Sequence, residues 1–97
     1  MNTAFLLTGS NVGDRKAHLD KAIAVLNEQC GHITHSSAIY ETAPWGKSDQ
    51  PSFLNQALQL ETTLNARQLI RRILKIEKQL GRIRKEKYGP RIIDIDI

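Results

Sequence analysis

The sequence is poor in cysteine and has no long apolar run. Cys30 is the only cysteine among 97 residues, so the chain forms no intramolecular disulfide, and we expect a buried, inert thiol in a reducing cytoplasm. The apolar run Ala4 to Leu7 is too short for the core of a signal peptide, and no stretch approaches the roughly 20 apolar residues of a membrane span. These absences predict a soluble, cytoplasmic protein.

Internal repeats, low-complexity tracts and linkers rich in glycine, proline or serine are also missing. The composition is 40% hydrophobic and 25% charged, which is near the average for globular proteins and unlike a disordered chain. A chain of this length buries one modest core. We therefore expect residues 1–97 to form a single folded domain.

Basic residues exceed acidic residues by fourteen to ten, a formal net charge of +4. The excess is local, because five basic residues fall between Arg82 and Arg91, with Lys78 just before them. A local excess of cations favours an anionic ligand over a generally adhesive surface.

Hydrophobic periodicity predicts a mixed fold. Expected strands cover residues 3–10, 32–41, 53–62 and 91–97, and expected helices cover residues 14–30 and 65–80. Asp14 and Asn65 are placed to begin the two helices, and Gly81 to end the second as its C′ residue. This order predicts an α+β fold of the ferredoxin-like βαββαβ type, an antiparallel sheet with both helices on one face.

The last expected strand carries the most suggestive pair of residues. Because side chains alternate along a strand, Asp94 and Asp96 share one face, about 6.6 Å apart, while the isoleucines at 93, 95 and 97 pack on the other. A hard divalent cation such as Mg²⁺ would remove the repulsion between the two carboxylates. An ordinary solvated strand face is the alternative.

The basic segment before this strand strengthens the ligand hypothesis. Guanidinium groups donate bidentately to phosphate, and phosphoryl transfer depends on such clamps together with Mg²⁺. Cations at the C-terminal end of a helix also interact favourably with the helix dipole. This interaction explains Arg82 and Arg84 without a ligand, but it does not explain Arg91. The segment GSNVGDRK lacks the known nucleotide-binding glycine patterns, and we interpret it as a turn and a helix cap.

Five motifs, in order, resemble the 6-hydroxymethyl-7,8-dihydropterin pyrophosphokinase family of folate biosynthesis. The signature-like segment is KYGPRIIDIDI, and the others are GSNVGD, YETAPWG, FLNQAL and IEKQLGRIR. The resemblance covers the whole chain. It implies an ATP-dependent transferase, a pyrophosphokinase that moves the pyrophosphoryl group of ATP to the pterin hydroxymethyl oxygen and uses two Mg²⁺ ions.

The resemblance also implies roles for individual residues. Asp94 and Asp96 would be the metal ligands. Together with Arg82 and Arg91, which would clamp the phosphates, they would be the catalytic residues. The residues that bind the nucleotide, here called the nucleotide side, would be Glu77, Arg82, Arg84, Tyr88 and Arg91. The residues that bind the pterin, here called the pterin side, would be Thr42, Ala43, Trp45, Phe53 and Asn55. As alternatives, Phe53 and Trp45 are ordinary apolar residues, Asn55 is a polar residue at a strand edge, and Glu77 is an ion-pair partner of Lys78 or Arg82.

The chain departs from the family in two respects. Phe53 stands where the family often has tyrosine and Tyr88 where it often has tryptophan, and both changes keep a flat ring for stacking. The chain also ends at Ile97, inside the signature, and lacks the family's C-terminal portion. We therefore expect weakened metal binding and self-association through surface left uncovered, which light scattering would detect.

Other functional classes fit parts of the sequence. An inactive fragment of the enzyme would share every motif. A ferredoxin-like module that binds nucleic acid or regulates another protein would share the fold order and the positive charge, but such sheets usually carry more stacking aromatics than this chain has. The family resemblance predicts ATP and the pterin as ligands, with no nucleic acid and no membrane.

Overall fold

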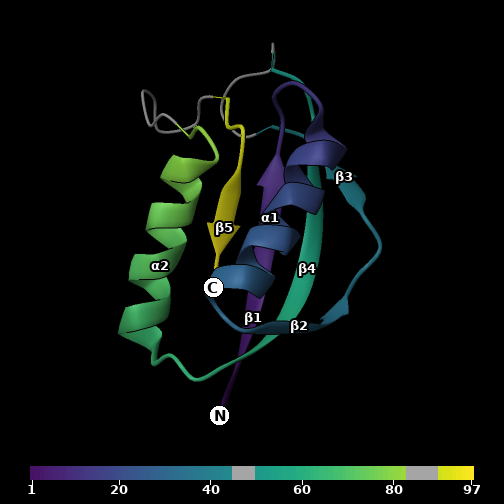
Figure 1. Cartoon of the computed structure of the whole chain (residues 1–97). Helices are drawn as coiled ribbons and strands as arrows, with labels where there is room; N and C mark the ends of the chain where they lie inside the picture. The colour runs from purple at the N-terminus through teal and green to yellow at the C-terminus, as the bar shows by residue number, and fades with distance from the viewer. Residues whose placement is uncertain (45–49, 83–89) are drawn as a thin grey trace.

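The computed structural model describes residues 1–44, 50–82 and 90–97. Its elements are β1 (Asn2–Ser10), α1 (Arg15–Gln29), β2 (His32–Ser36), β3 (Tyr40–Thr42), β4 (Phe53–Thr62), α2 (Ala66–Gln79) and β5 (Asp94–Asp96). All strand pairs are antiparallel, the order across the sheet is β2-β4-β1-β5, and β3 also pairs with β4. Both helices lie on one face of the sheet (Figure 1). The predicted α+β fold with its βαββαβ-like order is confirmed.

The helices begin where the sequence predicts. The Asp14 carboxylate accepts a hydrogen bond from the Ala17 backbone N–H at 3.1 Å. Asn65 forms a capping box with Gln68, in which each side chain accepts from the other residue's backbone N–H at 2.9 Å. These caps satisfy backbone donors that the first helical turn leaves free. No helix in the described part of the chain is long and apolar enough to cross a membrane.

Gly81 ends α2 as predicted, with a positive φ of 96°. Its N–H donates to the Lys78 carbonyl at 3.1 Å, and the Arg82 N–H donates to the Glu77 carbonyl at 3.0 Å. These two bonds form the Schellman motif that commonly closes a helix at a glycine. The motif fixes where the backbone of Arg82 leaves the helix, beside the last turn that carries Glu77.

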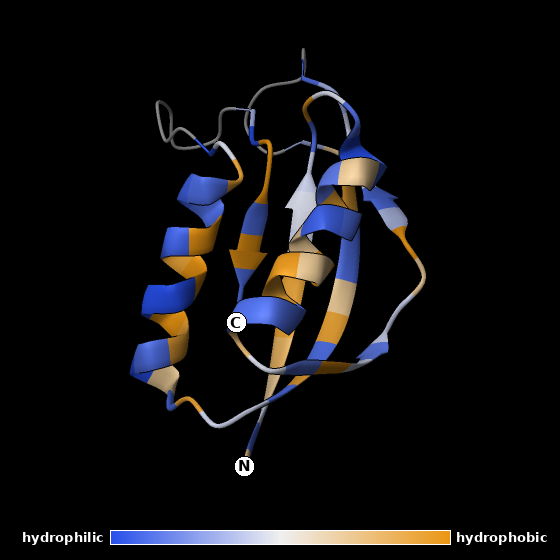
Figure 2. Ribbon diagram, viewed as in Figure 1, coloured by the Kyte–Doolittle hydropathy of each residue, from blue (hydrophilic) through white to orange (hydrophobic). Residues whose placement is uncertain are grey.

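The core lies between the sheet and the two helices. Its most buried apolar residues are Leu6, Leu19, Ala22, Leu26, Leu58, Leu60, Leu69, Ile73, Ile76, Ile93 and Ile95. In Figure 2 the apolar band of α2 faces β5, while charged residues cover the outer side of that helix. Both helices thus bury an apolar face against the sheet, on which Ile23 of α1 and Leu80, just after α2, stay half-buried.

Cys30 is buried immediately after α1, as predicted. Burial raises the pKa of its thiol, and the nearby Arg72 opposes that shift. A thiol with a raised pKa carries little thiolate and is a poor nucleophile. The position therefore fits an inert thiol.

The strand predicted over residues 32–41 is interrupted in the structure. It forms β2 and β3, both on the same edge of β4, with Ser37 between them. The Ser37 N–H donates to the Ala57 carbonyl, and the Ser37 hydroxyl accepts from the Ala57 N–H, each at 2.9 Å. The serine side chain thus replaces a backbone acceptor of the ladder, and competition of this kind ends regular strand structure.

The last predicted strand, 91–97, is also shorter than expected. Only Asp94–Asp96 form β5, because the backbone of Arg91 bonds to Asn11 instead of extending the ladder. Ile93 and Ile95 pack in the core as predicted, but Ile97 is 58% exposed because it follows the last paired residue. The expected packing of Ile97 was therefore wrong. Self-association through exposed apolar surface stays a prediction.

Candidate active site

Strand register places a predicted metal ligand and a predicted pterin-binding residue in one row across the sheet. Gly9 of β1 lies opposite Asp94 of β5 on one side and opposite Asn55 of β4 on the other. Tyr40 of β3 continues the row beyond Asn55. Directly opposed residues project to the same face. The predicted metal ligand and the predicted pterin amide therefore share the sheet face away from the helices, with a glycine between them.

The missing side chain at Gly9 leaves room for its neighbours. A Cβ atom there would lie 3.1 Å from Asn55 Oδ1 and 3.5 Å from a ring carbon of Phe53. The first distance is shorter than an ordinary contact, so a methyl group at position 9 would press on the amide of Asn55, for which glycine leaves room. Gly9 therefore sets the position of two residues predicted to contact the pterin.

Hydrogen bonds fix the orientation of the Asn55 amide. Its Nδ2 atom donates to Thr42 Oγ1 at 2.8 Å and approaches the Tyr40 carbonyl at 3.4 Å. Because both bonds use the amide nitrogen, Oδ1 is the atom turned toward Gly9. The structure thus brings Thr42, Phe53 and Asn55 together, and Ala43 follows Thr42 on the exposed side. Trp45 lies outside the described residues.

The charged half of the site is an ion cluster around Asp94. Arg82 Nη1 donates to Asp94 Oδ1 at 2.6 Å, and Arg91 Nη1 donates to Asp94 Oδ2 at 3.1 Å. The same Arg82 nitrogen also donates to a carboxylate oxygen of Glu77. Four of the predicted site residues therefore meet at the start of β5, while Arg84 and Tyr88 fall outside the described part of the chain.

The two arginines of the cluster differ in accessibility. The side chain of Arg91 is 27% exposed, whereas that of Arg82 is 5% exposed and holds two carboxylates. The buried Nε of Arg82 has no hydrogen-bond partner among the described residues. As a phosphate clamp Arg91 is therefore better placed than Arg82, for which the structure shows an ion-pair role. The clamp role of each arginine stays a prediction.

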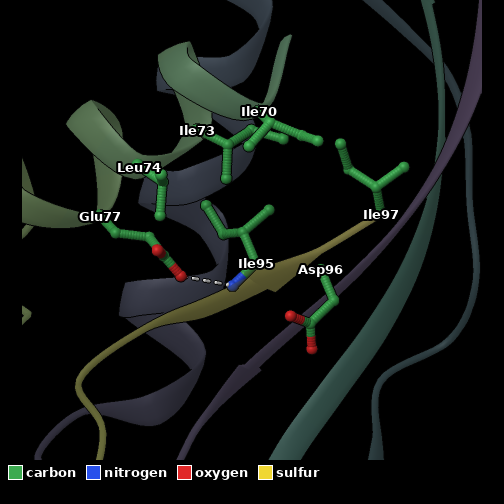
Figure 3. A pocket seen from close by; sticks show the side chains of 7 residues that line it. All are labelled: Ile70, Ile73, Leu74, Glu77, Ile95, Asp96 and Ile97. Carbon is green, nitrogen blue, oxygen red and sulfur yellow. Dashed lines mark hydrogen bonds between the residues drawn. The ribbon is translucent and has the colours of Figure 1, made fainter. Parts of the chain in front are cut away.

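Glu77 is the most buried member of the cluster, with 3% of its side chain exposed. Besides binding Arg82, its carboxylate accepts from the backbone N–H of Ile95 at 2.9 Å, the bond drawn in Figure 3. β5 lies at the edge of the sheet, so one of its sides pairs with no other described strand. Glu77 accepts a hydrogen bond from the Ile95 N–H on that side of β5. These contacts support the interpretation of Glu77 as an ion-pair partner, and its nucleotide-side role stays a prediction.

Asp96 is among the residues that line the pocket beside α2, but its carboxylate points away from the apolar side chains of that pocket. In Figure 3 Ile95 and Ile97 point toward Ile70 and Ile73 of that helix, while Asp96 points away from them. Partial burial raises the pKa of the Asp96 carboxyl group, and the neighbouring Asp94 carboxylate raises it further. The Asp94 carboxylate thus opposes ionisation of Asp96.

This carboxylate pair fits a magnesium ion. Within residues 1–44, 50–82 and 90–97, no group of three or more histidine, cysteine or acidic side chains is arranged to hold a metal. Mg²⁺ usually binds through one or two carboxylates and takes its other ligands from water and substrate phosphates. Asp94 and Asp96 supply that number of oxygen ligands, and a bound cation would relieve their repulsion.

Sequence reasoning missed a central part of this site. The GSNVGD segment was interpreted as a turn and a helix cap, yet it contains Gly9, which makes room for Asn55, and Asn11, which binds Arg91. Its occurrence among the five ordered motifs was the signal that could have revealed a role. The roles themselves depend on strand pairing and were not visible in the local pattern.

Comparison with known proteins agrees with this geometry. The chain is 43% identical over 97 residues to the 2-amino-4-hydroxy-6-hydroxymethyldihydropteridine pyrophosphokinase of Bacillus subtilis, with 99% of this chain and 58% of that protein covered. The identically named proteins of Aquifex aeolicus and Methylorubrum extorquens are 45% and 44% identical, and the alignments cover all of this chain and 60% and 62% of theirs.

The chain thus spans about three fifths of the length of these curated relatives. A family model, 7,8-dihydro-6-hydroxymethylpterin-pyrophosphokinase (HPPK), matches residues 5–97. That match includes residues 5–10 of β1, both helices and the whole candidate site. It favours the pyrophosphokinase hypothesis over the nucleic-acid-binding module. On this evidence, the chain belongs to the 7,8-dihydro-6-hydroxymethylpterin-pyrophosphokinase family.

Proposed function

We propose that this chain transfers the pyrophosphoryl group of ATP to 6-hydroxymethyl-7,8-dihydropterin, a step of folate biosynthesis. The hydroxymethyl oxygen loses its proton to solvent water and attacks the β-phosphorus of ATP. The bond from that phosphorus to the oxygen bridging the α-phosphorus breaks, so AMP leaves and the pterin diphosphate forms. Family membership supports this reaction.

The observation that carries the proposal is the row from Asp94 through Gly9 to Asn55. It puts an amide that can bind the polar edge of a heterocycle on the same sheet face as the carboxylates. A flat substrate lying over Gly9 could bind Asn55 at one end and present its hydroxymethyl group toward Asp94 and Asp96 at the other. This geometry suits positioning of two substrates for direct transfer.

On the phosphate side, the proposal assigns separate tasks to the charged residues. Arg91 donates to phosphate oxygens from guanidinium N–H groups other than the one on Asp94, because a guanidinium offers five donors. Asp94 and Asp96 would hold two Mg²⁺ ions, which would supply positive charge to offset that of the phosphate oxygens. Glu77 and Arg82 hold β5 so that both aspartates keep their places.

The direct test is an assay of the chain with ATP, Mg²⁺ and 6-hydroxymethyl-7,8-dihydropterin, with AMP as the product measured. We expect AMP that depends on both the pterin and Mg²⁺. Asp96→Asn should form far less AMP, and Glu61→Gln is its matched control, since Glu61 is an acidic residue that lies exposed at the far end of β4. Mg²⁺-dependent ATP binding without AMP would indicate an inactive fragment, and salt-sensitive oligonucleotide binding without ATP binding would favour the nucleic-acid module.

Gly9→Ala is expected to weaken pterin binding about tenfold, roughly the contribution of one hydrogen bond. The new methyl group would press on Asn55 Oδ1 and break the amide's alignment with Thr42. Binding of ATP with Mg²⁺ should not change, because the three atoms nearest to the new methyl belong to Phe53, Leu54 and Asn55 and not to the ion cluster. Calorimetry with each ligand measures both effects, and Ala57→Ser on the same face is the control. Unchanged pterin affinity would show that Asn55 does not bind the pterin.

A further inference from the structure

Asn11 is a fully buried polar residue, 0% exposed, at the junction of three segments that lie far apart in the sequence. It follows β1 directly and bonds both to Arg91, ahead of β5, and to residues 50 and 51, ahead of β4. We infer that Asn11 is a positioning residue that fixes the phosphate half of the site relative to the pterin half. The inference rests on the proposed function.

The contact with the phosphate half is a pair of hydrogen bonds. The Asn11 N–H donates to the Arg91 carbonyl at 3.0 Å, and Asn11 Oδ1 accepts from the Arg91 N–H at 2.7 Å. Together they hold the backbone of Arg91 from both sides. Because the Arg91 guanidinium lies on Asp94, a shift of this backbone would change where the cation stands relative to the proposed metal ligands.

The contact with the pterin half uses the amide nitrogen of Asn11. Nδ2 donates to Gln50 Oε1 and to the Pro51 carbonyl, both at 3.2 Å. Pro51 stands two residues before Phe53, where β4 begins and leads to Asn55. The Asn11 amide therefore ties the chain segment that leads into the pterin side to the backbone of Arg91.

Asparagine suits this place because its side chain combines an acceptor and two donors, and all three are used. Aspartate would keep the acceptor for Arg91 but lose both donors. Alanine would lose all of these side-chain bonds and leave the Arg91 N–H and the Pro51 carbonyl without them. Groups that lose their partners in a buried site cost stability, so a positioning role must be separated from a purely structural one.

Thr62→Val is a matched control for that separation. Thr62 is buried like Asn11, and its hydroxyl donates to the Cys30 carbonyl at 2.5 Å, but it lies at the other end of β4, opposite Asn2. Its replacement removes a buried hydrogen bond far from the site. We expect both variants to lower the melting temperature, with an effect on turnover for Asn11 only.

The experiment measures turnover with both substrates saturating, and the Kd of each substrate alone. For Asn11→Ala we expect turnover to fall about 10- to 100-fold, since misplacement of about 1 Å costs that much. Each Kd should change less than about threefold, because each half of the site keeps its own ligands. Asn11→Asp should recover part of the turnover, because its carboxylate still accepts from Arg91.

Each result decides between alternatives. Turnover in Asn11→Ala equal to that in Thr62→Val, or a loss that only follows the fraction unfolded, overturns the inference and leaves the proposed function intact. An unmutated chain that forms no AMP contradicts the proposed function, and the inference with it. If Asn11→Ala does not fold, Asn11→Asp decides alone: lower turnover at an unchanged Kd for ATP with Mg²⁺ supports the inference, and turnover like the unmutated chain overturns it.

Discussion

Asp96→Asn is expected to lower pyrophosphoryl transfer about 100-fold or more while making the folded chain more stable at neutral pH. Loss of a metal ligand removes several kcal/mol of charge stabilisation from the transition state, and each 1.4 kcal/mol is a factor of ten in rate. The side chain points away from the core, so the substitution leaves apolar packing intact. The enzyme assay at several Mg²⁺ concentrations measures the first effect.

The gain in stability follows from the raised pKa of Asp96. A carboxyl group whose pKa is raised by folding binds its proton more tightly in the folded state, so stability falls as pH rises through the raised pKa. The asparagine variant avoids this loss. The variant should therefore have a higher free energy of unfolding than the unmutated chain at pH 7. The difference should stay below about 1 kcal/mol, because the Asp96 side chain is exposed to solvent, and should vanish at pH values below the ordinary pKa of aspartate.

Urea unfolding at pH 3 and pH 7 tests that dependence. Asp20→Asn is the control, because Asp20 is an exposed carboxylate paired with Lys16 on α1 and has no part in the site. Full Mg²⁺-dependent activity in Asp96→Asn would show that Asp96 is not a metal ligand. A variant less stable than the unmutated chain at pH 7 would contradict the repulsion between Asp94 and Asp96.

Glu77→Ala is expected to cost about 3–5 kcal/mol of folding free energy, the usual result when one partner of a buried ion pair is removed. The substitution leaves Arg82 with Asp94 alone and the Ile95 N–H without its acceptor. A domain of this kind has about 5–15 kcal/mol of stability in total, so this is a large share of it. Urea unfolding followed by circular dichroism measures the loss.

Glu77→Gln separates the two contacts. The glutamine oxygen can still accept from the Ile95 N–H, but the neutral amide no longer balances the charge of Arg82. We therefore expect Glu77→Gln to lose less folding free energy than Glu77→Ala, but still to be less stable than the unmutated chain. Lys78→Ala, an exposed neighbour on the same turn, should stay within about 0.5 kcal/mol of the unmutated chain. A loss of less than about 1 kcal/mol for Glu77→Ala would show that the buried cluster does not hold β5 in place.

Several elements were predictable because their signals are local. The helix caps at Asp14 and Asn65 and the terminating Gly81 depend on residues within one turn, and each was found where the sequence placed it. β4 also has the predicted bounds, although its apolar residues Leu54, Ala57 or Leu58, and Leu60 alternate only imperfectly. The interruption at Ser37 was missed because it depends on a bond to Ala57, a residue of another strand.

The candidate site divides in the same way. The carboxylates Asp94 and Asp96 share a face by strand alternation alone, and the order of motifs was enough to indicate the family. The burial of Arg82 between Glu77 and Asp94 could not be predicted from the sequence. A charged residue just after a helix is expected to be solvated, and only the placement of β5 beside it shows otherwise. Arg91 was singled out by its position next to the aspartates, and its guanidinium donates to Asp94, while its role as a phosphate clamp stays a prediction.

By itself, the sequence determined the two helices, the order of helical and strand segments and the chemical types of the candidate site residues, since these depend on side-chain spacing along one segment. Tertiary structure alone decided which residues meet. Antiparallel register set Gly9 between Asp94 and Asn55, and the fold brought Asn11 to Arg91 across 80 positions of the chain. The physical reason is that pairing across a sheet depends on the packing of all its strands at once, and no single segment contains that information.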